Sequence, residues 1–435
     1  MTELPTTTNK HSLAQYAAAI GIDWADQKHD IALLAEPADH HKHQAVEHRV
    51  IESTPQALMT WVASLQERFQ ERKIAIAVEQ SRGPLIYFLS AFDFIDIYPV
   101  PTVTLKKLRE ALYPSGSKTD KDDSRLVLDV LTKHTDRLRP MKPESAEIRE
   151  LAALCEQRRH LVDERTGKLQ ALRDACKSYF PVIVELFDFK SPVLCRFLKR
   201  WDTMEKLQKT RPATLRKFFY ANRCRGDVIE RRLAAIKDAV ALTKDPGVIH
   251  PMKMRVFVLC KQIITLFEVI DPYERRICEL FEALPSAGIF KSLPGAGEAM
   301  APRLAVAFGE DKKKFQSATD IQNLSGTSPV TKRSGKSQNE VLFRWAAPTF
   351  MRQTFVEWAN HSRKASQWAQ AYYELCLDRG DRHNTALRKL AWKWQRIVFK
   401  LWNTGELYDE EKYVAALTKY GSPIVAKIEQ LAEPA

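Results

Sequence analysis

The first 142 residues alternate between short apolar runs and amphipathic stretches. Short apolar, β-branched runs bounded by polar turns predict strands. Such runs lie within residues 16–36 (two strands and a turn), 48–54, 72–81 and 95–102. Apolar residues at helical spacing predict helices within residues 54–70 and 83–94, near Thr104 and from the acidic stretch at residues 115–131.

In chain order these elements run βββαβαβα, and the helix of the acidic stretch follows. This is the order of an α/β RNase H-like (RuvC-like) fold, in which a three-stranded antiparallel meander continues into alternating helices and strands. We therefore expect a domain of this class at residues 16–142, after a flexible N-terminus at residues 1–15.

A long amphipathic helix is predicted at residues 143–180. Seven apolar residues occupy a and d positions of one heptad frame, and two arginines fill the remaining d positions. The apolar positions are Ile148, Leu151, Cys155, Val162, Leu169, Leu172 and Cys176, and the arginines are Arg158 and Arg165. The pattern fits either a coiled coil or one long helix packed on its own domain.

The rest of the chain is predicted to be mainly helical. Residues 181–288 form a charge-rich insertion or linker without a chemical motif, residues 289–410 a mainly α C-terminal domain, and residues 411–435 a tail. Residues 320–400 hold 14 Lys or Arg and 6 Asp or Glu, and six of the nine tryptophans lie between Trp345 and Trp402. Interleaved basic and aromatic residues are typical of nucleic-acid surfaces, although most of these tryptophans are expected in the core.

Composition narrows the class of partner. The net charge of +13 points to a polyanion, most often nucleic acid; the alternative is a basic enzyme without such a partner. Seven cysteines are spread singly without a CxxC pair, which argues against structural zinc and disulfides and fits a reducing cytoplasm. The N-terminus lacks the pattern of a signal peptide, and no apolar run reaches the roughly 18 residues of a membrane helix, so no membrane partner is expected.

Four carboxylates stand where such a sheet would bring them together. Asp23 ends the apolar run "AIGID" and Glu79 ends "IAIAVE", so both are expected at the rim of the sheet. Asp120 and Asp123 are three residues apart and share a face if the segment is helical. Alone, Asp120 would be read as a helix cap. The set of four hard oxygen ligands favours two Mg²⁺ or Mn²⁺ ions, which can activate a nucleophile and stabilise the leaving oxygen of a phosphodiester.

Several motifs resemble those of the insertion-sequence family one-ten transposases, called DEDD recombinases after this tetrad. The N-terminal motifs are "GIDWADQKHDIAL", "IAVEQSRGP" and "SKTDKDDS". The C-terminal motifs are "LPGAGEAMAPRLAVAFG", "NLSGTSPVTKRSGKS", "RWAAPTFMRQTF" and "WAQAYYELCLDRGDRHNTALRKLAWKWQRI". The resemblance covers roughly residues 18–180 and 288–403, leaves 181–288 unmatched, and departs from the family's acidic motif at Ser124, where alanine is frequent.

The resemblance implies a DNA transposase that pairs the metal tetrad with a nucleophilic serine. The family motif points to Ser334, with Ser325 as the alternative. A serine hydroxyl needs activation, and its attack would leave a phosphoserine link that keeps the bond energy for rejoining. Residues expected to contact nucleic acid are Lys118, Lys332, Arg333 and Lys336, and, in a turn that resembles a helix-hairpin-helix, Gly295 and Gly297. A purely structural turn is the alternative for the glycines.

The resemblance also implies partners. Family members use a noncoding bridge RNA that pairs with target and donor DNA, so the protein would bind both nucleic acids. They act as multimers, here a dimer or tetramer, in which one protomer's serine completes another's metal site, and the helix at 143–180 is a candidate for this pairing. The expected location is the bacterial cytoplasm, with the nucleoid when active.

Three other functions fit the same residues. In a Mg²⁺-dependent endonuclease or Holliday-junction resolvase, metal-activated water would attack and Ser334 would be idle. A site-specific DNA invertase could use the same scaffold. A nucleic-acid-binding scaffold with an inactive site would bind DNA without cutting it.

Overall fold

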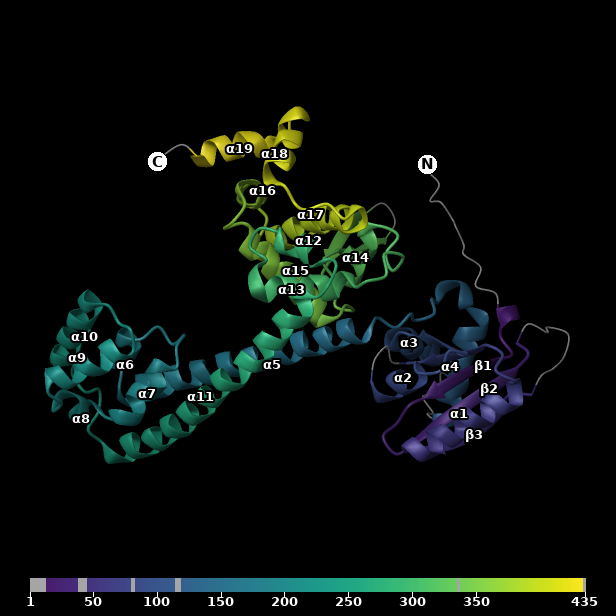
Figure 1. Ribbon diagram of the computed structural model, residues 1–435, viewed down its shortest axis with the longest axis horizontal. Coiled ribbons are helices and arrows are strands. Elements are labelled where there is room, and N and C mark those ends of the chain that lie inside the picture. Colours follow the sequence, from purple (N-terminus) through teal and green to yellow (C-terminus); the bar gives the residue numbers. More distant parts are fainter. Residues whose placement is uncertain (1–12, 38–44, 80–82, 114–118, 335–336, 433–435) are drawn as a thin grey trace. The chain divides into compact units, whose positions relative to one another are not determined.

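The computed structural model describes residues 13–37, 45–79, 83–113, 119–334 and 337–432, and only the backbone for those between 331 and 341. The chain divides into two compact units, Met1–Pro143 and Glu144–Ala435 (Figure 1). No helix in these described ranges is long and apolar enough to cross a membrane.

The first unit is built on a five-stranded sheet of order β3-β2-β1-β4-β5. Pairing is antiparallel between β1 and β2 and between β2 and β3, and parallel between β1 and β4 and between β4 and β5. The strands are β1 (Ala18–Asp23), β2 (Lys28–Ala35), β3 (Glu47–Glu52), β4 (Ile74–Val78) and β5 (Ile95–Pro99). The RNase H-like prediction is confirmed.

Helices cover both faces of this sheet. They are α1 (Pro55–Phe69), α2 (Pro84–Leu89), α3 (Thr102–Leu112) and α4 (Asp120–Lys133), with 3₁₀ turns η1 (Leu13–Gln15) and η2 (Thr135–Arg137). Successive side chains of a strand point to opposite faces. Ile74 and Ile76 of β4 therefore pack on the α1 side, and Ala75 and Ala77 on the α4 side. The small side chains let α4 approach the sheet closely.

Two long antiparallel helices organise the second unit (Figure 1). They are α5 (Ala146–Tyr179) and α11 (Pro246–Glu282). Arg158 of α5 pairs with Glu274 of α11, and the Arg165 guanidinium lies 4.5 Å from the centre of the Phe267 ring. The heptad seam of α5 thus packs against another helix of the same chain.

Between these two helices the chain forms a helical lobe. Its members are α6 (Val182–Leu186), α7 (Val193–Arg200), α8 (Met204–Gln208), α9 (Pro212–Ala221) and α10 (Gly226–Asp238). Phe197, Trp201 and Phe219 form its aromatic centre, joined by residues from the nearer ends of α5 and α11. We call residues 182–263 the lobe.

The C-terminal part packs on the other ends of α5 and α11. It contains α12 (Ala287–Lys291), α13 (Gly297–Phe308), α14 (Ala318–Leu324), the hairpin β6 (Val330–Ser334) and β7 (Ser337–Leu342), α15 (Thr349–Ser362), α16 (Gln367–Asp378), α17 (His383–Thr404), α18 (Glu410–Lys419) and α19 (Pro423–Ala432). The last two helices occupy the segment predicted as a tail.

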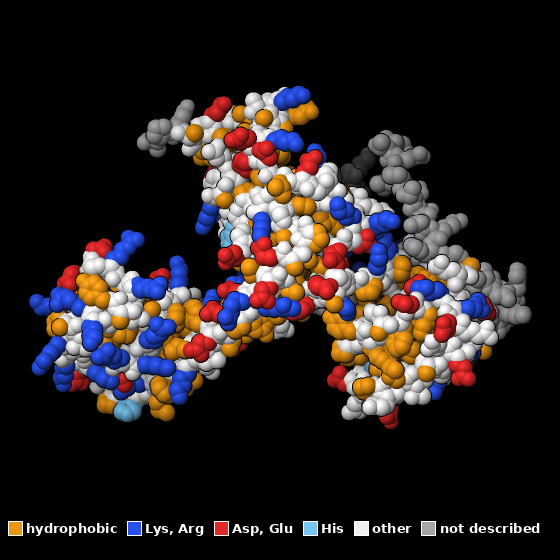
Figure 2. Space-filling view, viewed as in Figure 1, with side chains coloured by type: hydrophobic (Ala, Val, Ile, Leu, Met, Phe, Trp, Pro, Cys, Tyr) orange, Lys and Arg blue, Asp and Glu red, His pale blue; other side chains and the backbone are white. Residues whose placement is uncertain are grey.

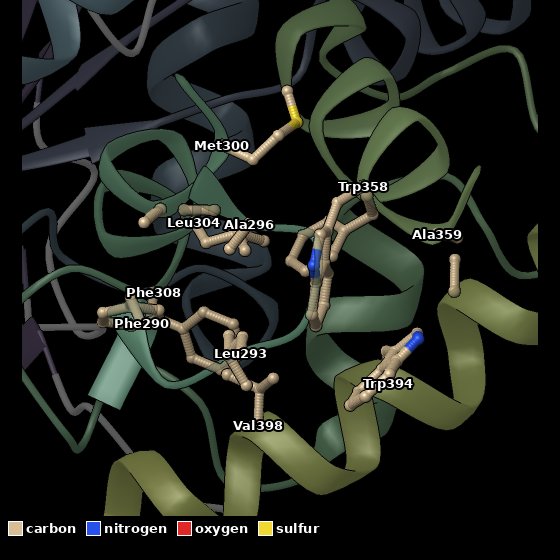
Figure 3. Packing of buried hydrophobic residues seen from close by; sticks show 14 of the residues in the cluster. Phe290, Leu293, Ala296, Met300, Leu304, Phe308, Trp358, Ala359, Trp394 and Val398 are labelled. Carbon is tan, nitrogen blue, oxygen red and sulfur yellow. The ribbon is translucent and has the colours of Figure 1, made fainter. Parts of the chain in front are cut away.

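Tryptophans form the centre of this C-terminal core. The rings of Trp358 and Trp394 lie 4.9 Å apart, with Phe290 and Phe308 nearby (Figure 3). Four of the six tryptophans in this region are fully buried, whereas Trp345 is 81% exposed. The expectation that most of them are core residues is confirmed, so few remain for stacking on nucleic-acid bases.

Candidate active site

Helix α4 lies against β1 at a position where the strand has no side chain. A Cβ added to Gly21 would lie 2.4 Å from the backbone nitrogen of Leu128 and 2.4 Å from the backbone oxygen of Ser124. Non-bonded carbon atoms prefer separations of about 3.5–4.0 Å. Glycine is therefore required here, and it sets the height of α4 above β1 two residues before Asp23.

Asp23 and Glu79 lie at one edge of the sheet. β1 and β4 run parallel with Ile22 opposite Val78, so one further step brings Asp23 level with Glu79. By strand alternation Asp23 faces the same side as Gly21, which is the α4 side. Glu79 follows two residues after Ala77, whose side chain packs on that side as well. Both residues are half-buried.

The acidic cluster forms the first turn of α4. Its N-cap is Thr119, whose hydroxyl oxygen accepts from the backbone N–H of Asp122 at 3.2 Å. Asp122 in turn accepts a hydrogen bond from the Thr119 hydroxyl, so it belongs to the cap rather than only to solvent. Asp120 is the first helical residue and is exposed. The helix therefore does not need Asp120 as its cap.

Asp123 faces inward and is 5% exposed. Its Oδ1 accepts a hydrogen bond from Nε of Arg109 on α3 at 2.7 Å and forms an ion pair with Nη2 of the same guanidinium, also at 2.7 Å. Charge-assisted bonds of this kind offset the cost of burying a carboxylate. Arg109 thus holds the most buried of the four predicted ligands.

His48 on β3 lies close enough to the start of α4 for the charges there to affect its pKa. Burial lowers the pKa of this β3 imidazole, and Lys121 of α4 lowers it further. Asp30 and Asp122 act in the opposite direction. Asp30 lies opposite Asp23 in the β1–β2 register, so the first turn of α4 lies beside the end of β1 that carries Asp23.

The four carboxylates are suitable ligands for a metal ion, but their side chains do not converge on one point. Across the described ranges, no three His, Cys, Asp or Glu side chains converge as a metal site. Asp23, Glu79 and Asp123 nevertheless share one edge and one face, and their oxygens suit a hard divalent cation. Binding would require the side chains to turn toward one another and Asp123 to exchange the Arg109 guanidinium for the cation.

Ser334 ends β6, the first strand of a hairpin. Its backbone pairs with that of Ser337, after an irregularity that begins at Lys332. The backbones of Lys332 and Arg333 lie in the same strand. Lys118 and Lys336 lie outside the described residues.

Ser325, the alternative nucleophile, is fully buried. Its hydroxyl accepts from Nε2 of Gln395 at 2.8 Å and lies 3.1 Å from the Thr327 hydroxyl. A serine enclosed in this way offers no surface to a phosphodiester, which favours Ser334 among the two.

Two family models match the chain. One, named for the DEDD transposases of IS110 and described as "Transposase", matches residues 20–181. The other, described as "Transposase IS116/IS110/IS902 family", matches residues 287–374. The chain belongs to the IS110 family of transposases. As an IS110-family transposase it is a DNA-binding, DNA-cleaving enzyme, and its DEDD domain implies metal-dependent catalysis.

Curated relatives agree with this membership. The mini-circle putative transposase for IS117 of Streptomyces coelicolor is 23% identical over 91% of this chain and 96% of its own. An uncharacterized 43.6 kDa protein of insertion element IS110 from the same species is 24% identical over 71% of this chain and 76% of its own. An uncharacterized 44.8 kDa protein of insertion element IS116 from Streptomyces clavuligerus is 25% identical over 81% of this chain and 87% of its own.

The glycine turn of this IS110-family transposase has a structural role at one position. Gly295 has a φ of +70°, and a Cβ there would lie 2.7 Å from the carbonyl carbon of His361 on α15. Trp358 of the same helix donates from Nε1 to the carbonyl of Pro294. Gly297 has a φ of +51° and open space around its Cβ position. A nucleic-acid contact at either glycine stays a prediction.

Sequence reasoning missed Arg109. Asp123 lies 14 positions after Arg109 and in a different helix, so no helical spacing relates them. The available signal was a basic, amphipathic helix immediately before the acidic motif, "LKKLREAL".

Proposed function

We propose that this IS110-family transposase cuts and rejoins DNA through a phosphoserine intermediate on Ser334, at a metal site formed by Asp23, Glu79, Asp120 and Asp123. The observation that carries the proposal is the close approach of α4 to β1 at Gly21. It keeps the acidic first turn at the sheet edge where β1 and β4 end.

The four carboxylates would hold Mg²⁺ or Mn²⁺, most readily two ions. Bound there, the metal would lower the barrier to nucleophilic attack and neutralise the charge that develops on the phosphate. Asp23, Glu79 and Asp123 would supply the inner oxygens because they share one face. Asp120, exposed at the helix start, would close the site from the solvent side.

Ser334 would act as the nucleophile. Its Oγ–P bond would form as one P–O bond of the DNA backbone breaks, which leaves a strand end with a free hydroxyl. Attack of a hydroxyl on the phosphoserine would reverse the step and join strands without a nucleotide cofactor. The enclosure of Ser325 supports this choice of serine. Lys332, Arg333, Lys336 and Lys118 would contact backbone phosphates.

A noncoding RNA would supply sequence recognition, and the protein would act as a dimer or tetramer with composite sites. Base pairing would read the DNA sequence, whereas the protein would hold backbones. The seam of α5 is covered by α11, so contacts between protomers would use other surfaces.

A covalent-trapping assay tests the proposal. Full-length protein is incubated with Mg²⁺, the noncoding RNA that flanks the gene and labelled element-end DNA, and the products are separated on a denaturing gel. We expect a protein-linked DNA band that is lost in Ser334→Ala and in Asp123→Asn but kept in Ser325→Ala. The last variant is the matched control.

Other outcomes would overturn the mechanism. Cleavage without a linked band that persists in Ser334→Ala would indicate attack by metal-activated water, as in an endonuclease or Holliday-junction resolvase. Linked DNA that matures only into inverted segments would indicate an invertase. Binding without any cleavage, unchanged by Asp23→Asn, would indicate an inactive scaffold.

A further inference from the structure

The positive charge of the chain is concentrated in the lobe. Residues 182–263 contain 18 Lys or Arg and 8 Asp or Glu, whereas the rest of the chain contains 49 and 46. The lobe therefore carries +10 of the net +13. Figure 2 shows Lys and Arg side chains gathered over α6 to α10 with few Asp or Glu between them. Neither family model covers this segment.

Most of these cations are not neutralised within the protein. All of residues 182–263 are described, and only Lys206, Lys209, Arg216 and Lys253 form ion pairs there. Of the other fourteen cations, all but Arg232 are exposed. Arg232 instead lies over the Phe187 and Phe219 rings, where it supports the core. An exposed surface with so many unpaired like charges is destabilised by self-repulsion until a polyanion binds.

The excess is densest around α9. Seven Lys or Arg and no Asp or Glu occur from residue 206 to residue 226. Four of the seven are exposed and have no carboxylate within ion-pair distance. These four, Arg211, Lys217, Arg223 and Arg225, are called the α9 patch.

The aromatic residues of the lobe indicate how such a polyanion would be held. Proteins that bind single strands stack bases on exposed aromatic rings. Phe197, Trp201 and Phe219 are instead buried in the lobe core, and among the lobe's aromatic residues only Tyr220 and Phe257 are more than half exposed. Cations without a stacking platform suit the phosphates of a double helix, which carry no direct sequence information.

We propose that the lobe is a binding surface for the sugar–phosphate backbone of a double-helical nucleic acid, with the α9 patch at its centre. The partner is either a helical stem of structured RNA or a DNA duplex, since both present the same closely spaced phosphates. The inference deepens the proposed function, on which it rests, by assigning backbone binding to a segment without catalytic residues.

The test compares binding by two charge-matched variants of the full chain. One carries Arg211→Gln, Lys217→Gln, Arg223→Gln and Arg225→Gln. The control carries Arg68→Gln, Arg72→Gln, Arg276→Gln and Lys412→Gln, which removes four exposed cations that are already ion-paired. Both lose four charges. Fluorescence anisotropy is measured with labelled RNA hairpin, DNA duplex and single-stranded DNA across a salt series, and circular dichroism confirms folding.

The α9-patch variant should bind duplex at least tenfold more weakly near 0.15 M salt, with a log–log salt slope reduced by up to about 3.6, because each lost phosphate contact removes about 0.9. The control variant should keep wild-type affinity within about threefold, since surface ion pairs leave little charge to offer. A loss confined to the RNA hairpin identifies the partner as RNA, and a loss confined to DNA identifies it as DNA.

Equal losses in both variants would overturn the inference, because net charge alone would then explain binding. Unchanged affinity of the α9-patch variant for both duplexes would overturn it as well. Binding does not require catalysis, so the affinity comparison can still be interpreted if the cleavage proposal fails. Conversely, if the α9-patch variant cleaves DNA and binds duplex with normal affinity, backbone binding by the lobe is refuted and the proposed active site is unaffected.

Discussion

Replacing Gly21 by alanine should push α4 away from β1. The added Cβ would meet the backbone of α4 at 2.4 Å on two atoms and at 2.9 Å on the Cα of Leu128. Because these are backbone atoms, no side-chain rotation can relieve the overlap. The helix must move by about 1 Å to restore ordinary contact distances.

The expected cost follows from this shift. Overpacking of a well-packed core costs about 1–3 kcal/mol, and a rigid backbone neighbour belongs at the upper end, so we expect about 3 kcal/mol. A misplacement of about 1 Å at a catalytic group can lower the rate about 100-fold. Gly21→Ala should therefore reduce both the local stability of α4 and DNA cleavage.

Amide hydrogen exchange measured by mass spectrometry would test this on the full chain. Peptides from β1 and α4 should lose protection by roughly 100-fold, since 1.4 kcal/mol corresponds to a factor of about ten in an opening constant. Peptides from α15 and α17 serve as an internal reference. Gly167→Ala is the matched control, because a Cβ at Gly167 on α5 meets nothing within 4 Å. That substitution should stabilise its helix by up to about 1 kcal/mol.

Protection in β1 and α4 that stays within about threefold of wild type would refute the close packing of α4 on Gly21. Full loss of protection throughout the first unit would instead show that the substitution unfolds it. Cleavage would then have to be tested in a variant that shifts α4 less.

Three further predictions concern other buried groups. Arg109→Gln should destabilise the metal-free protein by roughly 3 kcal/mol, because the buried Asp123 carboxylate loses its ion pair with Arg109. It should also enlarge the rise in thermal midpoint on adding Mg²⁺; an unchanged rise would show that the guanidinium does not compete with the cation. Burial lowers the pKa of His29 below 6.5, so the unfolded state binds the proton first as the pH falls. The free energy of unfolding should therefore decrease below about pH 6.5, by at most about 1.4 kcal/mol per pH unit. Urea midpoints at pH 5.5 and 7.5 should differ less in His29→Phe than in wild type. Exposed Cys278 should react with a chromogenic disulfide reagent in the native protein. Burial raises the pKa of the Cys155 thiol to about 12, so Cys155 should react only on unfolding. The absorbance of the thiolate released from the reagent measures both reactions.

The fold of the first unit could be predicted because the hydrophobic pattern of each strand and helix lies within a short stretch of sequence. Alternation in "IAIAV" already separates Ile74 and Ile76 from Ala75 and Ala77, and strand geometry alone then assigns them to opposite faces of a sheet. The heptads of residues 143–180 likewise predicted a helix. They did not say which helix would cover the seam, because a stripe of apolar residues fits any apolar partner of similar length.

Parts of the candidate site were readable for the same reason. Asp23 and Glu79 follow apolar strands, so their edge could be inferred before the register was known. The ion pair of Arg109 with Asp123 depends on the angle between α3 and α4, which no spacing encodes. The charge of the lobe could have been counted from the sequence, but the exposure of its cations follows only from which faces α6 to α10 bury.

The antiparallel pair of α5 and α11 also acts as a spacer of fixed length. The 34 residues of α5 span about 51 Å at 1.5 Å per residue. Side-chain pairs such as Arg276 with Glu150 and Arg158 with Glu274 connect the two helices along their length. One turn of a DNA duplex measures about 34 Å, so the pair is about one and a half turns long. A duplex lying along the pair would therefore present opposite sides of its backbone to the two ends of the pair.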